Sequence, residues 1–172
     1  MRFSNLVVAT GSGTLANAAG EKLRGIELET RYQVTADLLL AASASYHDAQ
    51  FTKYLFNDGE SSVDVAGKQL VLSPHVLASA GFLYTPSQGF GSIFIAKYVG
   101  RRFLDEKNSA RQGGYTTLDA TLSDTFGRWR MTLEGTNLTD RRPPVSASEF
   151  GSQSFYLLAG RMLWLRLAYH WR

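Results

Sequence analysis

The chain ends in GRMLWLRLAYHWR (Gly160–Arg172), a stretch that alternates between two kinds of side chain. The first set of alternate residues is apolar and ends in aromatic rings: Leu163, Leu165, Leu167, Tyr169 and Trp171. The other set includes Arg166, His170 and Arg172. Successive side chains of a β-strand point to opposite faces of the sheet. The stretch therefore predicts a strand with an apolar face and a charged face.

The same alternation recurs along the chain and predicts about eight strands. They are expected at residues 3–9, 25–33, 38–54, 73–84, 90–102, 115–126, 129–136 and 160–172. Short turns (35–37, 86–89, 127–128) alternate with long polar connections (55–72, 103–113, 138–155), and residues 10–20 read as a further loop. Short turns on one side, long loops on the other and strands of about ten residues are typical of an outer-membrane β-barrel.

Composition removes several classes of function. The 172 residues contain no cysteine, which excludes disulfides and thiol chemistry. The net charge of +3 comes without a basic cluster interleaved with aromatic residues, so nucleic-acid binding is not expected. No apolar run is long enough for a transmembrane helix. The apolar patch Leu6–Val8 is too short for a signal peptide, and we expect none.

A soluble β-sandwich is the main alternative, because its strands also alternate between apolar and polar residues. The polar face of such a sandwich meets water and usually carries many lysines and glutamates. Here that face carries small hydroxyl residues such as Ser43, Ser45, Thr121 and Ser123. The predicted strands are also longer than those of most soluble proteins. The pattern favours the barrel and leaves the sandwich or jelly roll open.

Seven segments together resemble one family of membrane proteins. In chain order, they are Asn17–Gly20 with Gly25–Glu29, Ser45–Thr52, Leu72–His75, Tyr98–Arg102, Gly114–Asp119, Gly135–Arg141, and Gly160–Arg161 with the alternating residues that follow. Each segment is similar to a motif of TonB-dependent outer-membrane receptors, and they occur in the family's order. The resemblance implies an all-β fold: the antiparallel, carboxy-terminal strands of a larger transmembrane barrel, about eight of about 22.

The resemblance also implies a function. Residues 1–172 are expected to form a single partial barrel domain, without the family's plug domain or its energy-coupling box. The expected location is the outer membrane of a Gram-negative bacterium. The implied activity is energised uptake of a bulky nutrient, most often a ferric siderophore, and not catalysis. Implied partners are outer-membrane lipid, the missing plug and upstream strands, the barrel-assembly machinery and, through the plug alone, the TonB energy complex.

Two other functions stay open at this stage. One is a self-contained small outer-membrane barrel that acts as an adhesin or structural protein, and the other is a soluble β-sandwich binding module. An enzyme is not expected, because no convergent catalytic set can be named. Glu27 and Glu29 are interpreted as lumen-facing charges, and His47, His75 and His170 lack metal-ligand spacing. No cofactor or metal is expected.

The alternation assigns side chains to two sides of the barrel wall. The residues expected to face the lumen are Glu27, Glu29, Arg31, Asp119, Arg130, Glu134, Arg166 and His170. The residues expected to face lipid are Leu38, Leu40, Val76, Phe82, Leu118, Leu122, Leu133, Leu163, Leu165 and Leu167. Tyr46, Tyr84, Tyr169 and Trp171 are expected in the aromatic girdle or the insertion signal. The three long connections are the candidate regions for ligand contact, and no ligand-binding residue is assigned. Arg101-Arg102 and Arg141-Arg142 are expected as solvated charges at the barrel rim, with lipid A phosphates or an anionic ligand as the alternative partners.

Overall fold

The computed structural model describes residues 2–3, 6–9, 15–18, 20–57, 61–148 and 154–171. Every regular element in these ranges is a β-strand. Across the same ranges, no helix is both long and apolar enough to cross a membrane.

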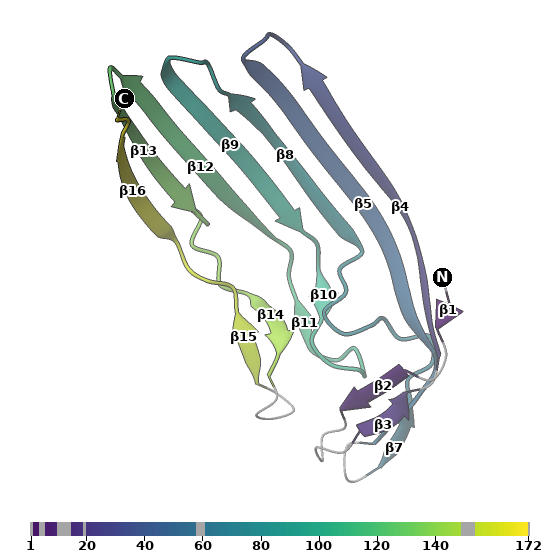
Figure 1. Ribbon diagram of the computed structural model, residues 1–172. Helices are drawn as coiled ribbons and strands as arrows, with labels where there is room; N and C mark the ends of the chain where they lie inside the picture. The colour runs from purple at the N-terminus through teal and green to yellow at the C-terminus, as the bar shows by residue number, and fades with distance from the viewer. Residues whose placement is uncertain are drawn as a thin grey trace.

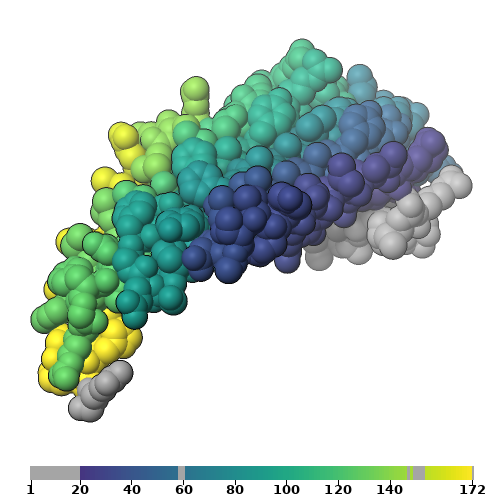
Figure 2. Space-filling model, turned by 90° about the horizontal axis from the view of Figure 1, so that it is seen from above, coloured from purple at the N-terminus to yellow at the C-terminus, as the bar shows by residue number. Residues whose placement is uncertain are grey.

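Eight strands form one antiparallel sheet, whose long members are neighbours in both sequence and space (Figure 1). In sheet order they are β1 (Arg2–Phe3), β4 (Gly20–Gln33), β5 (Leu38–Lys53), β8 (Val76–Tyr84), β9 (Gly89–Val99), β12 (Tyr115–Phe126), β13 (Trp129–Thr136) and β16 (Met162–Tyr169). Seen from above, the molecule is a curved band (Figure 2). Among the described residues β4 and β16 do not pair with each other, so the sheet is not closed.

The short turns all lie at one end of the sheet, where local chemistry closes them (Figure 1). Between β4 and β5, the Thr35 hydroxyl oxygen accepts hydrogen bonds from the backbone amides of Asp37 and Leu38. Gly89 and Gly127 have φ angles of 78° and 59°, in the left-handed region that glycine adopts most readily. A glycine at the first turn position suits a two-residue hairpin, as between β12 and β13. These turns fall where the sequence predicted them.

The long connections lie at the opposite end and contain strands that the sequence did not predict. β6 (Leu55–Asn57) pairs with β7 (Ser62–Asp64), and β10 (Arg102–Phe103) pairs with β11 (Arg111–Gln112). β14 (Pro144–Ala147) pairs with β15 (Phe155–Leu157). These pieces are two to four residues long, too short for alternation to show in a sequence. The predicted strand over 90–102 accordingly ends at Val99, before the separate β10.

The predicted first strand, residues 3–9, is wrong as a single barrel strand. Only Arg2–Phe3 joins the large sheet, opposite Glu21 and Lys22 of β4. β2 (Leu6–Ala9) instead pairs with β3 (Leu15–Ala18), within the expected loop over 10–20. A partner so near in the chain costs little loop-closure entropy, which favours the local hairpin. β4 also begins at Gly20 rather than at residue 25, through a bulge between Gly20 and Glu21.

Among the described residues few apolar side chains are buried, and these lie in the first long connection and at the adjoining end of β5. Val65 is fully buried, and Phe51 and Ala49 are nearly so. On the sheet itself Ile26 and Leu165 keep 77% and 71% of their surface exposed. A β-sandwich would cover one face of this sheet with a second sheet, whereas the other sheets in the described chain are two-stranded. The expected fold, an antiparallel portion of a larger β-barrel, is confirmed.

Candidate functional site

Strand register places the residues expected to face lipid on one face of the sheet, called here the apolar face. Leu40 lies opposite Phe82, and Leu122 lies opposite Leu133, which in turn lies opposite Leu165. The remaining members are Leu38, Val76, Leu118, Leu163 and Leu167. All ten therefore form one continuous surface. Their contact with lipid stays a prediction.

Aromatic rings gather near both ends of the apolar face. At the short-turn end the ring centroid of Tyr169 lies 4.8 Å from that of Trp129 and 4.7 Å from that of Trp171. Tyr84, also expected in the girdle, ends β8 at the same side. Tyr46 lies nearer the long connections and stacks on His75 at 5.8 Å. Two aromatic levels separated by aliphatic residues match the girdles of membrane barrels.

Asp124 is a charged residue on the apolar face that sequence reasoning missed. It lies opposite Phe90 on β9 and Met131 on β13, next to the short turn at Gly127. Its side chain is exposed. The sequence contained the necessary information, because Asp124 lies two residues after Leu122 and six after Leu118 in the alternating stretch Tyr115–Phe126. Alternation therefore puts all three side chains on one face.

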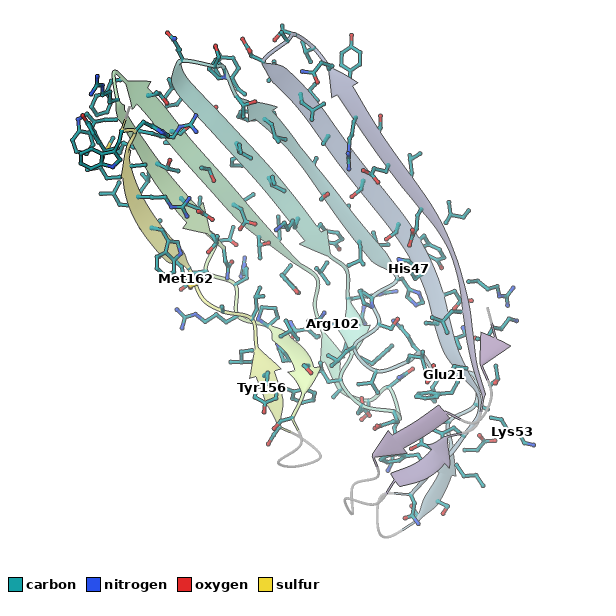
Figure 3. The ribbon with its side chains drawn as sticks, viewed as in Figure 1. Glu21, His47, Lys53, Arg102, Tyr156 and Met162 are labelled. Carbon is teal, nitrogen blue, oxygen red and sulfur yellow. The ribbon has the colours of Figure 1, made fainter. Side chains whose placement is uncertain are left out.

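The charged residues expected to face the lumen share the opposite face, called here the polar face. Glu29 pairs with Arg31 at 2.6 Å between Oε1 and Nη2, so this carboxylate and guanidinium belong to one strand. Lys97 of β9 pairs with Asp119 of β12 at 2.7 Å. Figure 3 shows side chains projecting from both sides of the sheet. The expected members Arg130, Glu134 and Arg166 lie on the same face through cross-strand register, and His170 follows β16 directly.

One row of this face is polar across five strands. Glu29, Ser43, Ser79, Lys97 and Thr117 are successive cross-strand partners from β4 to β12. The hydroxyl oxygens of Ser43 and Ser79 lie 2.9 Å apart and form a hydrogen bond. This polar row offers a carboxylate, hydroxyls and an ammonium side by side, a surface suited to polar ligands or a protein partner.

His47 lies toward the long-connection end of the sheet (Figure 3). Together with Glu27, also on the polar face, it lines a hollow there. His47 Nε2 is 2.9 Å from the Ser45 hydroxyl and 3.9 Å from the Glu27 carboxylate. The hollow has a volume of about 970 Å³, and residues 70–74 of the long connection form part of its wall. His75 Nδ1 lies 2.7 Å from the His47 carbonyl oxygen, so two histidines that are distant in sequence meet here.

His47 and His75 meet through one ring nitrogen and one backbone carbonyl. Among the described residues, no three side chains of His, Cys, Asp or Glu gather so that they could hold a metal ion. Glu27 and Glu29 are likewise engaged with His47 and Arg31 rather than with each other. The arrangement can form hydrogen bonds with a ligand.

Asn137 organises the base of the last long connection. Its amide nitrogen donates hydrogen bonds to the carbonyl oxygens of Arg141 and Ala159, both at 2.7 Å. Its backbone amide donates to the Asp119 carboxylate, which also holds Lys97. Asn137 is buried and has a φ of 48°, in the left-handed region that asparagine tolerates better than most residues. The Asp140 backbone amide donates a hydrogen bond to the Asn137 carbonyl oxygen at 2.8 Å, so Asn137 begins a turn directly after β13.

Asp140, in the same segment, accepts a hydrogen bond from the Arg161 amide at 2.8 Å and pairs with Arg142 at 3.0 Å. The Arg161 amide, and then the Arg142 guanidinium, hold the pKa of the Asp140 carboxyl below its ordinary value. The base of the connection is thereby tied to the beginning of the last strand. Arg141 and Arg142 were both expected at the rim, and Arg142 forms the ion pair with Asp140.

Arg102 differs from its neighbour Arg101, although both were expected at the rim. Arg102 is buried, lies over the Tyr115 ring at 5.6 Å and donates a hydrogen bond to the Pro144 carbonyl oxygen (Figure 3). Its Nε is buried and has no hydrogen-bond partner among the described residues. Arg101 is exposed. The buried guanidinium therefore joins two long connections.

A side chain also joins the first two long connections. The Asn108 side-chain oxygen accepts a hydrogen bond from the backbone amide of Gln69 at 2.8 Å. The Asn108 side-chain nitrogen donates a hydrogen bond to the backbone carbonyl of Gln69 at 3.0 Å. Asp105 holds the same turn by accepting hydrogen bonds from Ser109 and Ala110. Burial alone would raise the pKa of Asp105, but these hydrogen bonds outweigh it and lower the pKa. We call residues 61–75, 100–114 and 137–148 the loop layer.

Comparison with known proteins identifies the family. Residues 1–138 match the family model described as "TonB dependent receptor-like, beta-barrel". The chain is 30% identical over 112 residues to the ferrioxamine receptor of Yersinia enterocolitica, covering 65% of this chain and 15% of that protein. It is 27% identical over 149 residues to the ferrichrome outer membrane transporter/phage receptor of Escherichia coli K12, covering 80% of this chain and 19% of that protein.

Solved structures show the same fold. The siderophore receptor PiuA of Acinetobacter baumannii superposes with a TM-score of 0.76 at 23% identity, over 95% of this chain and 24% of PiuA. The ferric yersiniabactin uptake receptor FyuA of Yersinia pestis superposes with a TM-score of 0.76 at 23% sequence identity. The match covers 96% of this chain and 25% of FyuA. The chain thus spans about a quarter or less of these relatives. The matched model, covering most of the chain, shows that this protein belongs to the TonB-dependent receptors and corresponds to strands of their β-barrel.

Proposed function

We propose that these strands form part of the wall of an outer-membrane receptor that takes up a ferric siderophore. The observation that carries the proposal is a sheet with one continuous apolar face and one charged face, in a chain whose relatives are siderophore receptors. In lipid every backbone polar group needs an internal partner, so strands cross a membrane only as a closed barrel. The open edges of β4 and β16 therefore pair with further strands.

Each region of the chain takes a role in this proposal. The apolar face contacts lipid, and the Tyr169–Trp129–Trp171 cluster lies at the membrane boundary. The polar face lines the lumen. The loop layer and the His47 hollow lie at the end where the ligand enters, because long connections of bacterial barrels are extracellular. The proposed activity is transport, and the chain's own residues contribute binding and shape rather than catalysis.

Deleting the gene in its native host tests the proposal. Uptake of radioactive iron is measured with ferrioxamine and with ferrichrome, the ligands named for the two relatives. Loss of uptake of a ferric siderophore, its return on complementation and its dependence on TonB are expected. Unchanged uptake of every ferric siderophore tested, or uptake that persists without TonB, would contradict the proposal. Fractionation of the membranes checks the location separately.

A further inference from the structure

Asp124 of β12 lies among aromatic and apolar side chains near the short-turn end of the apolar face. Its cross-strand partners are Phe90 on β9 and Met131 on β13, both exposed. Trp129 is its diagonal neighbour on β13, about 7–8 Å away in an antiparallel pair. Among the described residues, no side chain forms an ion pair or a hydrogen bond with the Asp124 carboxylate. This exposed carboxylate can therefore bind a cation from outside the chain.

A guanidinium and further aromatic rings lie one strand away. Arg128, in the turn between β12 and β13, is exposed, and its Nη1 lies 3.5 Å from the hydroxyl oxygen of Tyr169 on β16. The Tyr169 ring is also the one that contacts both indole rings. Trp129 belongs to the strand between those of Asp124 and Tyr169. We call this group of side chains the Asp124 site: Asp124, Arg128, Trp129, Tyr169 and Trp171.

The charges of the Asp124 site select the chemical class of its ligand. A carboxylate beside aromatic rings attracts a cation, and a guanidinium binds phosphate through charge-assisted hydrogen bonds. An anionic ligand would satisfy the guanidinium but bring a negative charge close to the carboxylate. A simple cation would leave the guanidinium without an anion. A zwitterion that carries an ammonium and a phosphate on one short linker satisfies both groups.

The surface next to the Asp124 site favours a lipid over a soluble zwitterion. Leu122 and Leu133 form the next cross-strand pair on the same face, and Leu165 is the partner of Leu133 on β16. This aliphatic surface runs from the site toward the long connections, so it can contact the acyl chains of a molecule whose headgroup lies at Asp124. Tryptophan and tyrosine rings are also enriched at the headgroup level of membranes. A soluble zwitterion would gain nothing from the leucines.

We propose that the Asp124 site binds the headgroup of phosphatidylethanolamine, a zwitterionic phospholipid with a primary ammonium, in the membrane leaflet at the short-turn end. The Asp124 carboxylate accepts hydrogen bonds from the ammonium, the aromatic rings attract the same cation, and the Arg128 guanidinium donates to the phosphate. The inference rests on the part of the proposed function that places the apolar face in a membrane. It does not depend on which nutrient is transported.

Native mass spectrometry of the complete receptor, purified from the outer membrane of its host and stripped of lipid, tests the site. The probes are phosphatidylethanolamine, phosphatidylcholine and phosphatidylglycerol with identical acyl chains. The wild type is expected to retain phosphatidylethanolamine roughly three- to fivefold more strongly than phosphatidylglycerol, the scale of one exposed ion pair. Phosphatidylcholine, whose ammonium has no N–H donors, should lie between them. Asp124→Asn should abolish the preference and Asp124→Glu should keep it, whereas Arg128→Gln should weaken retention of all three lipids.

Asp37→Asn is the matched control, because Asp37 is an exposed carboxylate in the short turn between β4 and β5. Heat-modifiable gel mobility shows that each variant has folded. An unchanged preference in Asp124→Asn, an equal loss in Asp37→Asn, or equal retention of the three lipids by the wild type would overturn the proposal. Siderophore uptake is measured separately in the same cells. A lipid preference without uptake would sink the proposed function and leave the Asp124 site standing, and uptake without the preference would do the reverse.

Discussion

The two ends of the sheet are built by different means. At the short-turn end, the Thr35 hydroxyl accepts hydrogen bonds from residues two and three positions along the chain, and two glycines supply the positive φ angles of the other turns. At the other end, the loop layer buries Val65 and Phe51 and is joined across connections by Asn108, Arg102 and Asn137. The strands between them keep their apolar side chains exposed. In the part of the chain that the structure describes, buried apolar side chains thus lie at one end of the sheet, and the strands elsewhere depend on their surroundings.

The largest effect is expected from a charge on the apolar face. Leu165→Arg should lower the free energy of unfolding in bilayers by about 2–4 kcal/mol, because it places a guanidinium in hydrocarbon. Thr121→Arg, on the polar face opposite Glu134, is the control and should change it little. Urea unfolding of the protein in lipid vesicles measures both. Equal losses for the two variants would mean that the faces do not differ in environment.

Asn137→Ala should have the next largest effect, and it acts at the long-connection end alone. The variant leaves the carbonyls of Arg141 and Ala159 without their donors, which costs about 1–3 kcal/mol of stability. Limited proteolysis should then cut residues 138–148 and 154–161 faster than in the wild type. Thr139→Val is the control, because it removes one hydroxyl from the same turn. Unchanged cleavage in Asn137→Ala would show that the last connection is held by other contacts.

Adjacent arginines allow a matched comparison within the loop layer. Arg102→Ala removes the contact to Pro144 and the Tyr115 ring, and should cost about 1–2 kcal/mol. Arg101→Ala alters an exposed charge and should change stability by less than about 0.5 kcal/mol. Hydrogen exchange of residues 100–114 and 141–148 reports the loosening. Equal hydrogen-exchange rates in Arg102→Ala and Arg101→Ala would show that the buried guanidinium does not hold the two connections together.

The smallest effect is a pH dependence confined to the loop layer. The pKa of Asp105 is lowered in the folded chain, so its hydrogen bonds stabilise the turn above the ordinary aspartate pKa. That stabilisation is lost as the pH falls through the lowered pKa. Hydrogen exchange of Ser109 and Ala110 should therefore increase below about pH 4. Asp105→Asn should abolish the change, and an unaltered pH profile in that variant would contradict it.

The sequence predicted the sheet well, because each long strand carries its own alternation. Tyr115–Phe126 and Trp129–Thr136 have the predicted limits, and all ten residues assigned to the apolar face share it. The loop layer could not be predicted in the same way. Its pairings join residues such as Gln69 and Asn108 that are far apart in the chain, and its strands are too short to show a period. Such contacts depend on tertiary structure that local pattern does not encode.

The candidate site shows the same division. Alternation placed Glu29 and Arg166 on one face, but it could not show that Arg31 pairs with Glu29 or that His47 and His75 meet. It also treated Arg101 and Arg102 as equivalent, although one is exposed and the other buried.

Asp124 has a consequence for the vertical position of the proposed barrel wall. Its carboxylate lies on the apolar face, so the hydrocarbon must end before it, toward Leu122. If the sheet shifted by one residue pair along its strands in one direction, Asp124 would enter the acyl chains. A shift the other way would lift the Trp129–Tyr169 cluster out of the headgroup region. One carboxylate and two rings thereby fix the depth at which the whole receptor would sit in its membrane.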